Sequence, residues 1–157
     1  MLFAKLIVNV FVSLCILIST PTLADEPNLD KDMLHIPVPY DSIVFSPLMD
    51  GPIQIAVLSG DLQTGPSSIM LRFPPKFLGV MHYHNASYHA VVISGVSKHW
   101  VKGEDETAAP LQTKGDYWYQ AGKQPHQDSF PSDQATTVFL RFEGPLDFHI
   151  AQDTASK

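Results

Sequence analysis

The sequence predicts a single all-β domain, folded as a sandwich or a barrel. Short apolar segments rich in β-branched and aromatic residues recur at close spacing, which is typical of strands. All 9 glycines, and every one of the 13 prolines except Pro21, lie after residue 24 and are spread along the rest of the chain. These breakers leave little room for helices of usual length. The two observations together indicate about nine short strands, as in sandwiches and barrels.

Turn signals bound the predicted strands. The first strand alternates apolar and polar side chains with a period of two and stops at the turn-prone Ser59-Gly60-Asp61. Pro74-Pro75 ends the second strand, and Gly95 closes the fourth. The strands are predicted at residues 53–57, 68–73, 80–84, 88–93, 98–101, 116–120, 124–128, 136–142 and 148–150.

The beginning of the chain has the pattern of a cleaved secretory signal. Lys5 gives a positive start, residues 6–18 are almost entirely apolar, and Thr22-Leu23-Ala24 offers the small residues that a signal peptidase reads. This apolar run is shorter than the roughly 20 residues that a transmembrane helix needs. We therefore expect residues 1–24 to be removed and the protein to be exported to the periplasm or the extracellular space without a stable membrane anchor. An uncleaved N-terminal anchor is the alternative.

The predicted mature chain consists of an extended arm (residues 25–40), a barrel (41–150) and a short tail (151–157). Removing Lys5 from the 10 basic residues leaves 9 against 16 acidic ones, a net charge of −7. Such a surface repels phosphate backbones, which excludes nucleic acid as a partner. The single cysteine, Cys15, leaves with the signal, so a core or a bound metal has to hold the fold together without disulfides.

Histidines form the most specific pattern of the sequence. His82 and His84 are two residues apart in a predicted strand, so their imidazoles lie on the same face. Such a pair suits Zn, Fe, Mn, Ni or Cu. Downstream, a strand opens at Gly115, residues 121–124 form a tight turn, and the returning strand begins at Pro125-His126. This hairpin would turn His126 toward the first pair.

At this point the sequence resembles the cupin superfamily. The first cupin motif is Gly, five residues, His-x-His, three or four residues, Glu, six residues and Gly; the second is Gly, five residues, Pro-x-Gly, two residues and His. Three features depart from it: Gly79 lies too near His82, Ala121 replaces the second motif's Pro, and its turn glycine is shifted to Gly122. The resemblance covers roughly residues 53–148. Within the superfamily, the sequence is most similar to uncharacterised single-domain cupins of the anti-sigma-factor type (ChrR-like, or DUF4437-like).

The motif's glutamate is also missing, which leaves the fourth metal position open. Counting three residues after His84 places Tyr88 there, and counting four places His89. His89 gives a site of four imidazoles and is our preferred fourth ligand. Tyr88 gives three imidazoles and a phenol, which binds only if the metal lowers its pKa. Tyr88 would otherwise line the pocket and leave metal positions open for a substrate.

The resemblance implies a double-stranded β-helix, a jelly-roll-like barrel with one divalent transition metal in its mouth, and a homodimer. Tyr88 and Trp118 are candidates for the wall of a substrate pocket. Arg72 would bind a carboxylate if it faced inward; the alternative is that it points outward or pairs with an acid. The sequence shows no nucleophile triad and no paired carboxylates in the predicted strands, so the metal is the only candidate for chemistry.

Two functions follow from this pattern. The first is a metal-dependent enzyme of the dioxygenase, isomerase or hydrolase type, acting on a small molecule. The second is a metal- or ligand-binding module that stores, senses or presents a small molecule without turnover.

Overall fold

The structure, a computed structural model, describes residues 36–151. The chain divides into two units, Met1–Pro37 and Val38–Lys157, and every helix and strand of the described residues belongs to the second. The predicted signal (residues 1–24), most of the predicted arm (25–40) and all of the predicted tail (151–157) except its first residue lie outside the described residues. Within residues 36–151, no helix has the length and apolar character needed to cross a membrane.

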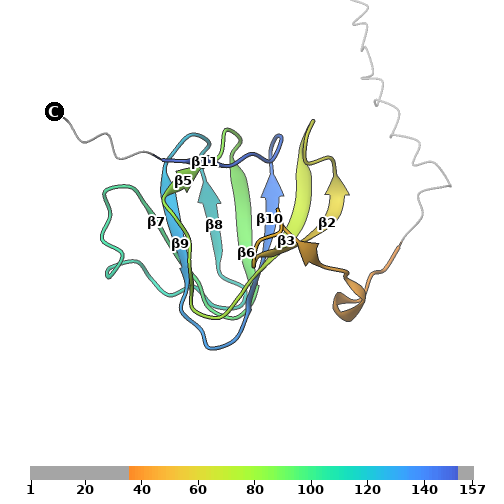
Figure 1. The fold of residues 1–157 in the computed structure, drawn as a ribbon, viewed down its shortest axis with the longest axis horizontal. Helices are drawn as coiled ribbons and strands as arrows, with labels where there is room; N and C mark the ends of the chain where they lie inside the picture. Colours follow the sequence, from red (N-terminus) through yellow and green to blue (C-terminus); the bar gives the residue numbers. More distant parts are fainter. Residues whose placement is uncertain (1–35, 152–157) are drawn as a thin grey trace, which may run out of the picture. The chain divides into compact units, whose positions relative to one another are not determined.

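Two antiparallel sheets make up the second unit (Figure 1). A 3-10 helix, Tyr40–Ser42, precedes them. The larger sheet has the order β1 (Ser46–Pro47), β2 (Gln54–Gly60), β3 (Ser67–Phe73), β10 (Thr136–Phe142), β6 (Tyr88–Ser94) and β8 (Tyr117–Gln120). The smaller sheet has the order β11 (His149–Ile150), β5 (His82–Tyr83), β9 (His126–Phe130) and β4 (Phe77–Leu78), and β7 (Lys98–Val101) also pairs with β9.

This architecture confirms the predicted all-β fold. Each of the nine predicted segments overlaps an observed strand, and β7 and β10 have the predicted bounds. The structure adds β1 and β4, which are two residues long and therefore too short to show an alternating pattern. It also extends β2 to Gly60, into the predicted turn, with a register shift between Val57 and Ser59.

Side chains from both sheets fill the space between them. Alternate residues of β10, namely Val138, Leu140 and Phe142, point into this core, as the two-residue period of a strand requires. The Phe73 ring of β3 stacks on Phe130 of β9, with the ring centroids 3.7 Å apart. The larger sheet and the smaller sheet therefore share one apolar core. Its buried members are Ile55, Ile69, Tyr88, Ala90, Phe130, Val138, Leu140 and Phe142.

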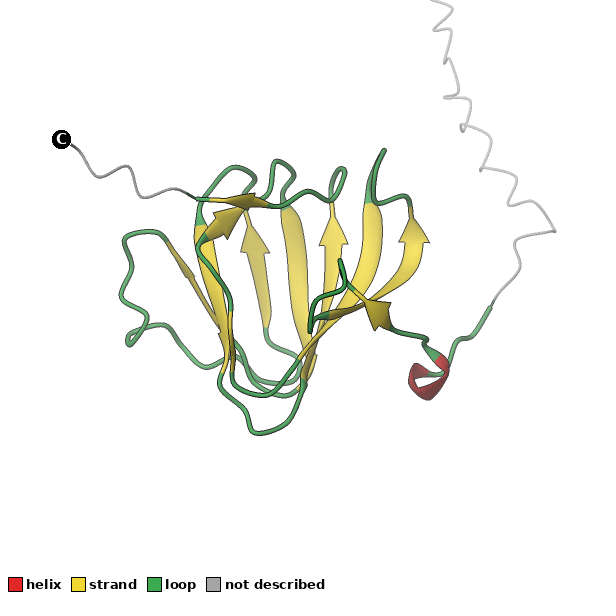
Figure 2. Ribbon diagram, in the orientation of Figure 1, coloured by secondary structure: helices red, strands yellow, loops and turns green. Residues whose placement is uncertain are grey.

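Short connections at one end of the sheets position the histidine-bearing segments. There β5 and β11 pair antiparallel (Figure 2). The turn before β9 packs against the segment that follows His84: a Cβ on Gly122 would lie 2.3 Å from the carbonyl oxygen of Asn85. The Lys123 backbone N–H donates to the His84 carbonyl oxygen at 2.6 Å. Glycine at residue 122 thus permits the close approach that joins the two cupin-like motifs.

Candidate metal centre

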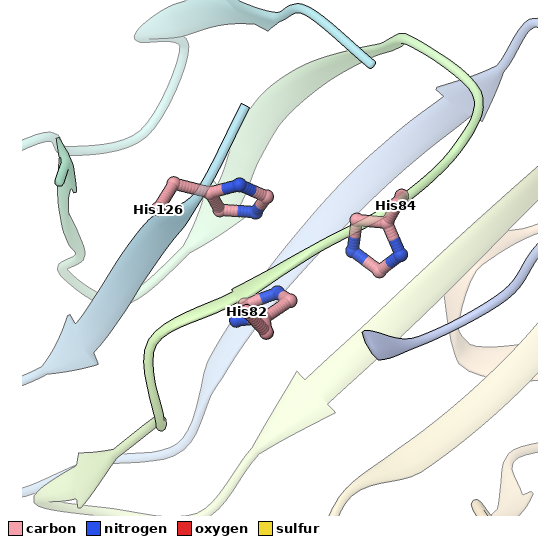
Figure 3. Close-up of side chains that lie close together, drawn as sticks. All are labelled: His82, His84 and His126. Carbon is pink, nitrogen blue, oxygen red and sulfur yellow. The ribbon is translucent and has the colours of Figure 1, made fainter. Parts of the chain in front are cut away.

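Three histidines from two distant segments meet at this end of the fold (Figure 3). His82 lies in β5, His84 follows that strand, and His126 begins β9 directly opposite His82 in the strand register. All three are buried, with exposed fractions of 8%, 9% and 0%. One ring nitrogen from each lies within 4.8 Å of the other two. The convergence that the sequence predicted is therefore present.

Backbone carbonyls decide which ring nitrogens face one another. The Nδ1–H of His82 donates to the Val80 carbonyl at 2.8 Å, and the Nδ1–H of His126 donates to the Gln124 carbonyl at 3.0 Å. His84 makes the same kind of bond to the carbonyl of Asp147. A carbonyl oxygen only accepts, so Nδ1 carries the proton in each ring and Nε2 keeps its lone pair. This is the arrangement found around metal-ligating histidines.

Burial keeps the imidazoles of His84 and His126 neutral. It lowers the pKa of His84, and it lowers the pKa of His126 from 6.5 to about 4. At neutral pH the Nε2 atoms of His84 and His126 are therefore lone-pair donors that no proton occupies. This donor set fits a divalent first-row transition metal and suits the hard ions Mg²⁺ and Ca²⁺ poorly.

Tyr88, and not His89, lies beside the three rings. The phenol of Tyr88 donates to Nε2 of His126 at 3.1 Å, and burial raises its pKa well above 10, so it is a neutral hydroxyl. His89 follows in β6 and therefore points to the opposite face of the sheet. Its side chain is 42% exposed and bonds to the hydroxyl of Tyr117 and to Glu143. This placement corrects the preference for His89 as the fourth ligand.

His82 and His84 border a cavity of about 510 Å³ between the sheets. Of the residues predicted to line a pocket, Tyr88 and Trp118 belong to its wall. Arg72 does not, because its neighbours Leu71 and Phe73 take the inward positions of β3. The Arg72 guanidinium lies instead over the ring of Phe45, 3.8 Å from the ring centroid. The inward placement of Arg72 is therefore corrected, and the outward alternative describes it.

A carboxylate that the sequence interpretation overlooked also faces this cavity. Asp128 lies two residues after His126 in β9 and so shares its face of the strand. His99 of β7 lies opposite Asp128 in the register, and its Nδ1 is 2.8 Å from Asp128 Oδ1. The predicted strands showed no paired carboxylates, and this single acid was not identified from the sequence. The signal was present: the two-residue period that paired His82 with His84 also pairs His126 with Asp128.

His99 is held as an imidazolium. The Gln120 side-chain nitrogen donates to the carbonyls of Ala121 and Gln124, so its Oε1 is free to accept from His99 Nε2 at 2.8 Å. Both ring nitrogens of His99 thus donate. Burial lowers the pKa of His99, but the hydrogen bond and the charge of Asp128 outweigh it and raise the pKa overall. The same contact keeps the pKa of Asp128 low despite burial, so the carboxylate in the cavity wall belongs to an ion pair.

The segment after β10 completes the site and was also missed. Asp147 supplies the carbonyl for His84, and its side chain accepts hydrogen bonds from Asn85 and His149. Phe148 stacks on the ring of His82, with the centroids 4.6 Å apart. The contacts to His84 and His82 are made by a backbone oxygen and an aromatic face, and neither leaves a motif in a sequence.

Solved structures with a similar fold include cupins and enzymes. An RmlC-like cupin from Shewanella frigidimarina aligns with a TM-score of 0.55 at 16% identity, over 69% of this chain and 89% of its own. A candidate acetylacetone dioxygenase from Methylibium petroleiphilum gives 0.58 at 18%, over 82% and 88%. The polyketide cyclase RemF from Streptomyces resistomycificus gives 0.60 at 11%, over 78% and 89%.

No family model matches the sequence, and no curated protein matches it. At these identities the likeness concerns the fold. The two antiparallel sheets and the aligned structures confirm the predicted cupin fold, a jelly-roll-like barrel.

Proposed function

We propose that this protein is an exported metalloenzyme that holds one divalent transition-metal ion through His82, His84 and His126 and acts on a small molecule. The observation that carries the proposal is the shared orientation of the three rings. Each donates Nδ1–H to a backbone carbonyl, which leaves three Nε2 lone pairs around one space. Without an ion, the Nε2 atoms of His82 and His84 would face His126 with no hydrogen-bond donor between the rings.

An ion held by three protein ligands keeps positions open toward the cavity. It would supply Lewis-acid polarisation of a substrate oxygen, or a place for O₂ if the metal is redox-active. Zn, Fe, Mn, Ni and Cu all fit imidazole ligands. The candidate acetylacetone dioxygenase and the polyketide cyclase among the similar folds favour chemistry on an oxygen-bearing organic compound.

Residues of the chain itself prepare the cavity for such chemistry. The Tyr88 hydroxyl stays protonated and is placed to donate a hydrogen bond beside the ion. The Asp128 carboxylate faces the cavity as an acceptor, fixed by the His99 imidazolium. The apolar walls exclude water, which strengthens both interactions.

Export and dimerisation are part of the proposal. Residues 1–24 carry the composition of a secretory signal, and the predicted mature chain has no cysteine to oxidise. A homodimer is proposed because pairing would cover exposed strand edges such as that of β8. The closer kinship with single-domain cupins of the anti-sigma-factor type also stays a proposal.

A binding module without turnover is the second candidate. It is favoured by Tyr88, which lies close enough to His126 to complete a set of four protein ligands. A closed four-ligand set is typical of structural metal sites, whereas three ligands are typical of catalytic ones.

Elemental analysis of the purified protein tests the proposal. We expect about one equivalent of transition metal per chain in the parent and little in His82→Ala or His126→Ala, because each variant removes one of three ligands. His89→Ala is the matched control, since it removes a histidine outside the cluster and should keep the metal. Equal metal content in all four proteins would overturn the metal site.

A further inference from the structure

The wall of the cavity is almost entirely apolar and largely aromatic. Aliphatic residues from β3 and β10 form part of it, and rings from both sheets form the rest. Its volume of about 510 Å³ is in the range of cavities that enclose drug-sized molecules. Seven phenylalanine, tyrosine and tryptophan side chains contribute to it: Phe73, Phe77, Tyr88, Trp118, Phe130, Phe142 and Phe148.

The charges in this wall are unfavourable for an anionic ligand. No lysine or arginine among residues 36–151 lines the cavity, and Arg72 lies on the outer face of the larger sheet. Two carboxylates do line it, Asp128 and Asp147. Apart from a metal ion, nothing in the wall would neutralise a carboxylate, phosphate or sulfonate that left water.

Few polar groups in the wall are free to bind a ligand. The side chain of Asp147 already accepts from Asn85 and His149. Asp128 uses Oδ1 for His99, and its Oδ2 has no hydrogen-bond partner among the described residues. The Tyr88 hydroxyl is the other free group once a metal takes His126 Nε2. The indole N–H of Trp118, which has no hydrogen-bond partner among the described residues, is a third. Three polar groups cannot satisfy the many hydroxyls of a sugar, because each unpaired buried hydroxyl weakens binding.

The mouth of the cavity is apolar as well. Four of the residues that line it are more than half-exposed to solvent, and they come from the loop before β2, from β4, from the connection to β5 and from the segment before β11. An exposed apolar rim that continues into an apolar cavity marks a path for an apolar ligand. The rim residues are Met49, Leu78, Val80 and Phe148.

We infer that the cavity takes an uncharged, mainly apolar ring compound that carries a hydroxyl group, with this hydroxyl placed between the three histidines and the free oxygen of Asp128. The ligand's hydroxyl group donates a hydrogen bond to Asp128, and its oxygen faces the histidines. The inference rests on the proposed function for the ion that the oxygen meets. The preference for uncharged rings comes from the wall alone and holds with or without the metal.

Calorimetric titration with three bicyclic probes and glucose tests this inference. The probes are 2-naphthol, its methyl ether 2-methoxynaphthalene, which lacks the hydroxyl proton, and naphthalene-2-sulfonate, which adds a charge. We expect 2-naphthol to bind about tenfold more tightly than the methyl ether, because a hydrogen bond to a buried carboxylate is lost. We expect it to bind at least about tenfold more tightly than the sulfonate, and glucose not to bind.

Each titration is done on Zn²⁺-loaded protein and on protein treated with a chelator. The order of affinities should be the same in the Zn²⁺-loaded and the chelator-treated protein. This separates the inference from the proposed metal site, because a protein that binds no metal would overturn the metal site and leave the selectivity for rings intact. In Asp128→Asn, the preference for 2-naphthol over its methyl ether should fall to about twofold.

A lysine placed in the rim tests the charge argument. In Leu78→Lys, naphthalene-2-sulfonate should gain about fivefold in affinity, because the ammonium group offsets its charge at the mouth. Val57→Lys is the matched control: it is equally exposed, lies outside the cavity lining and should leave all affinities within about twofold. Equal affinity of the parent for 2-naphthol and the sulfonate, or no binding of either uncharged probe, would overturn the inference.

Discussion

His126 and His99 lie side by side on two paired strands and behave in opposite ways. Their ring centroids are 5.1 Å apart, one in β9 and the other in the paired strand β7. Burial acts on both. Yet the pKa of His126 is lowered to about 4, whereas the pKa of His99 is raised. The comparison shows that burial alone does not fix the charge of a histidine.

The hydrogen-bond partners make the difference. His126 gives one N–H to a backbone carbonyl and keeps one lone pair, which makes it a ligand. His99 donates hydrogen bonds from both ring nitrogens, one to the Asp128 carboxylate and one to the side-chain oxygen of Gln120. The Gln120 amide is held with its oxygen toward His99 because its nitrogen donates to two backbone carbonyls. The neutral ring can bind an ion, and the charged ring fixes Asp128. One residue type thus supplies two functions on two paired strands.

Removing the Asp128 carboxylate should have the largest effect on stability, because it takes away the group that distinguishes His99 from His126. Asp128→Ala leaves the His99 imidazolium buried without its counter-charge, which we expect to cost about 3–5 kcal/mol of unfolding free energy. Urea unfolding in the presence of a chelator measures the loss without a contribution from metal. The double variant with His99→Phe should recover part of it, because no charge is then left unpaired.

Asp133→Ala is the matched control for that loss. Its carboxylate also has a cationic partner, the Lys76 ammonium at 2.8 Å, but both groups are mostly exposed. Exposed ion pairs contribute little, so the urea midpoint should hardly change. If Asp128→Ala and Asp133→Ala shift the midpoint equally, the His99–Asp128 pair is not buried and paired as described.

The sequence was sufficient for the fold and for the three histidines because both depend on local period and spacing. The alternation within β10 and the pair His82 and His84 are visible as two-residue repeats. The position of His89 was misjudged because the missing glutamate allowed two counts. A difference of one residue in a strand moves a side chain to the opposite face of the sheet.

Other parts of the site depend on contacts that no local pattern encodes. The carbonyl of Asp147 reaches His84 across 63 residues, and the pairing of His99 with Asp128 depends on the register between β7 and β9. The sequence left both orientations of Arg72 open because its strand is apolar on both sides of it. Its cation is instead placed over Phe45, which no spacing rule connects to it.

Measuring the free energy of unfolding against pH tests the lowered pKa of His126. The folded chain binds this proton near pH 4, while the unfolded chain binds it near 6.5. The unfolded state therefore holds more protons between these values, and stability falls as pH falls through this window and is complete above it. Between pH 7.5 and 5.0 the metal-free parent should lose roughly 2 kcal/mol more than His126→Gln, which lacks the group.

The raised pKa of His99 gives the opposite sign. Its contribution is complete below pH 6.5 and is lost as pH rises through the raised value. Urea unfolding of metal-free parent, His126→Gln and His99→Gln across this range measures both signs. Identical pH profiles for the parent and His126→Gln would show that His126 is not held neutral by burial.

The smallest expected effect concerns Tyr88 and decides its role. Its hydroxyl competes with a metal for the lone pair of His126, at a hydrogen bond of 3.1 Å. If the ion is held by three histidines, Tyr88→Phe removes this competitor and should raise the affinity for Zn²⁺ by about fivefold, the equivalent of roughly 1 kcal/mol. If the phenol is the fourth ligand, the same change should instead lower the affinity by tenfold or more, on the order of 1.4 kcal/mol. Competition with a chromogenic chelator measures whether the Zn²⁺ affinity rises or falls. Burial holds the Tyr88 hydroxyl protonated in the metal-free chain, so ligation by the phenol would have to displace that proton. We therefore expect the affinity to rise.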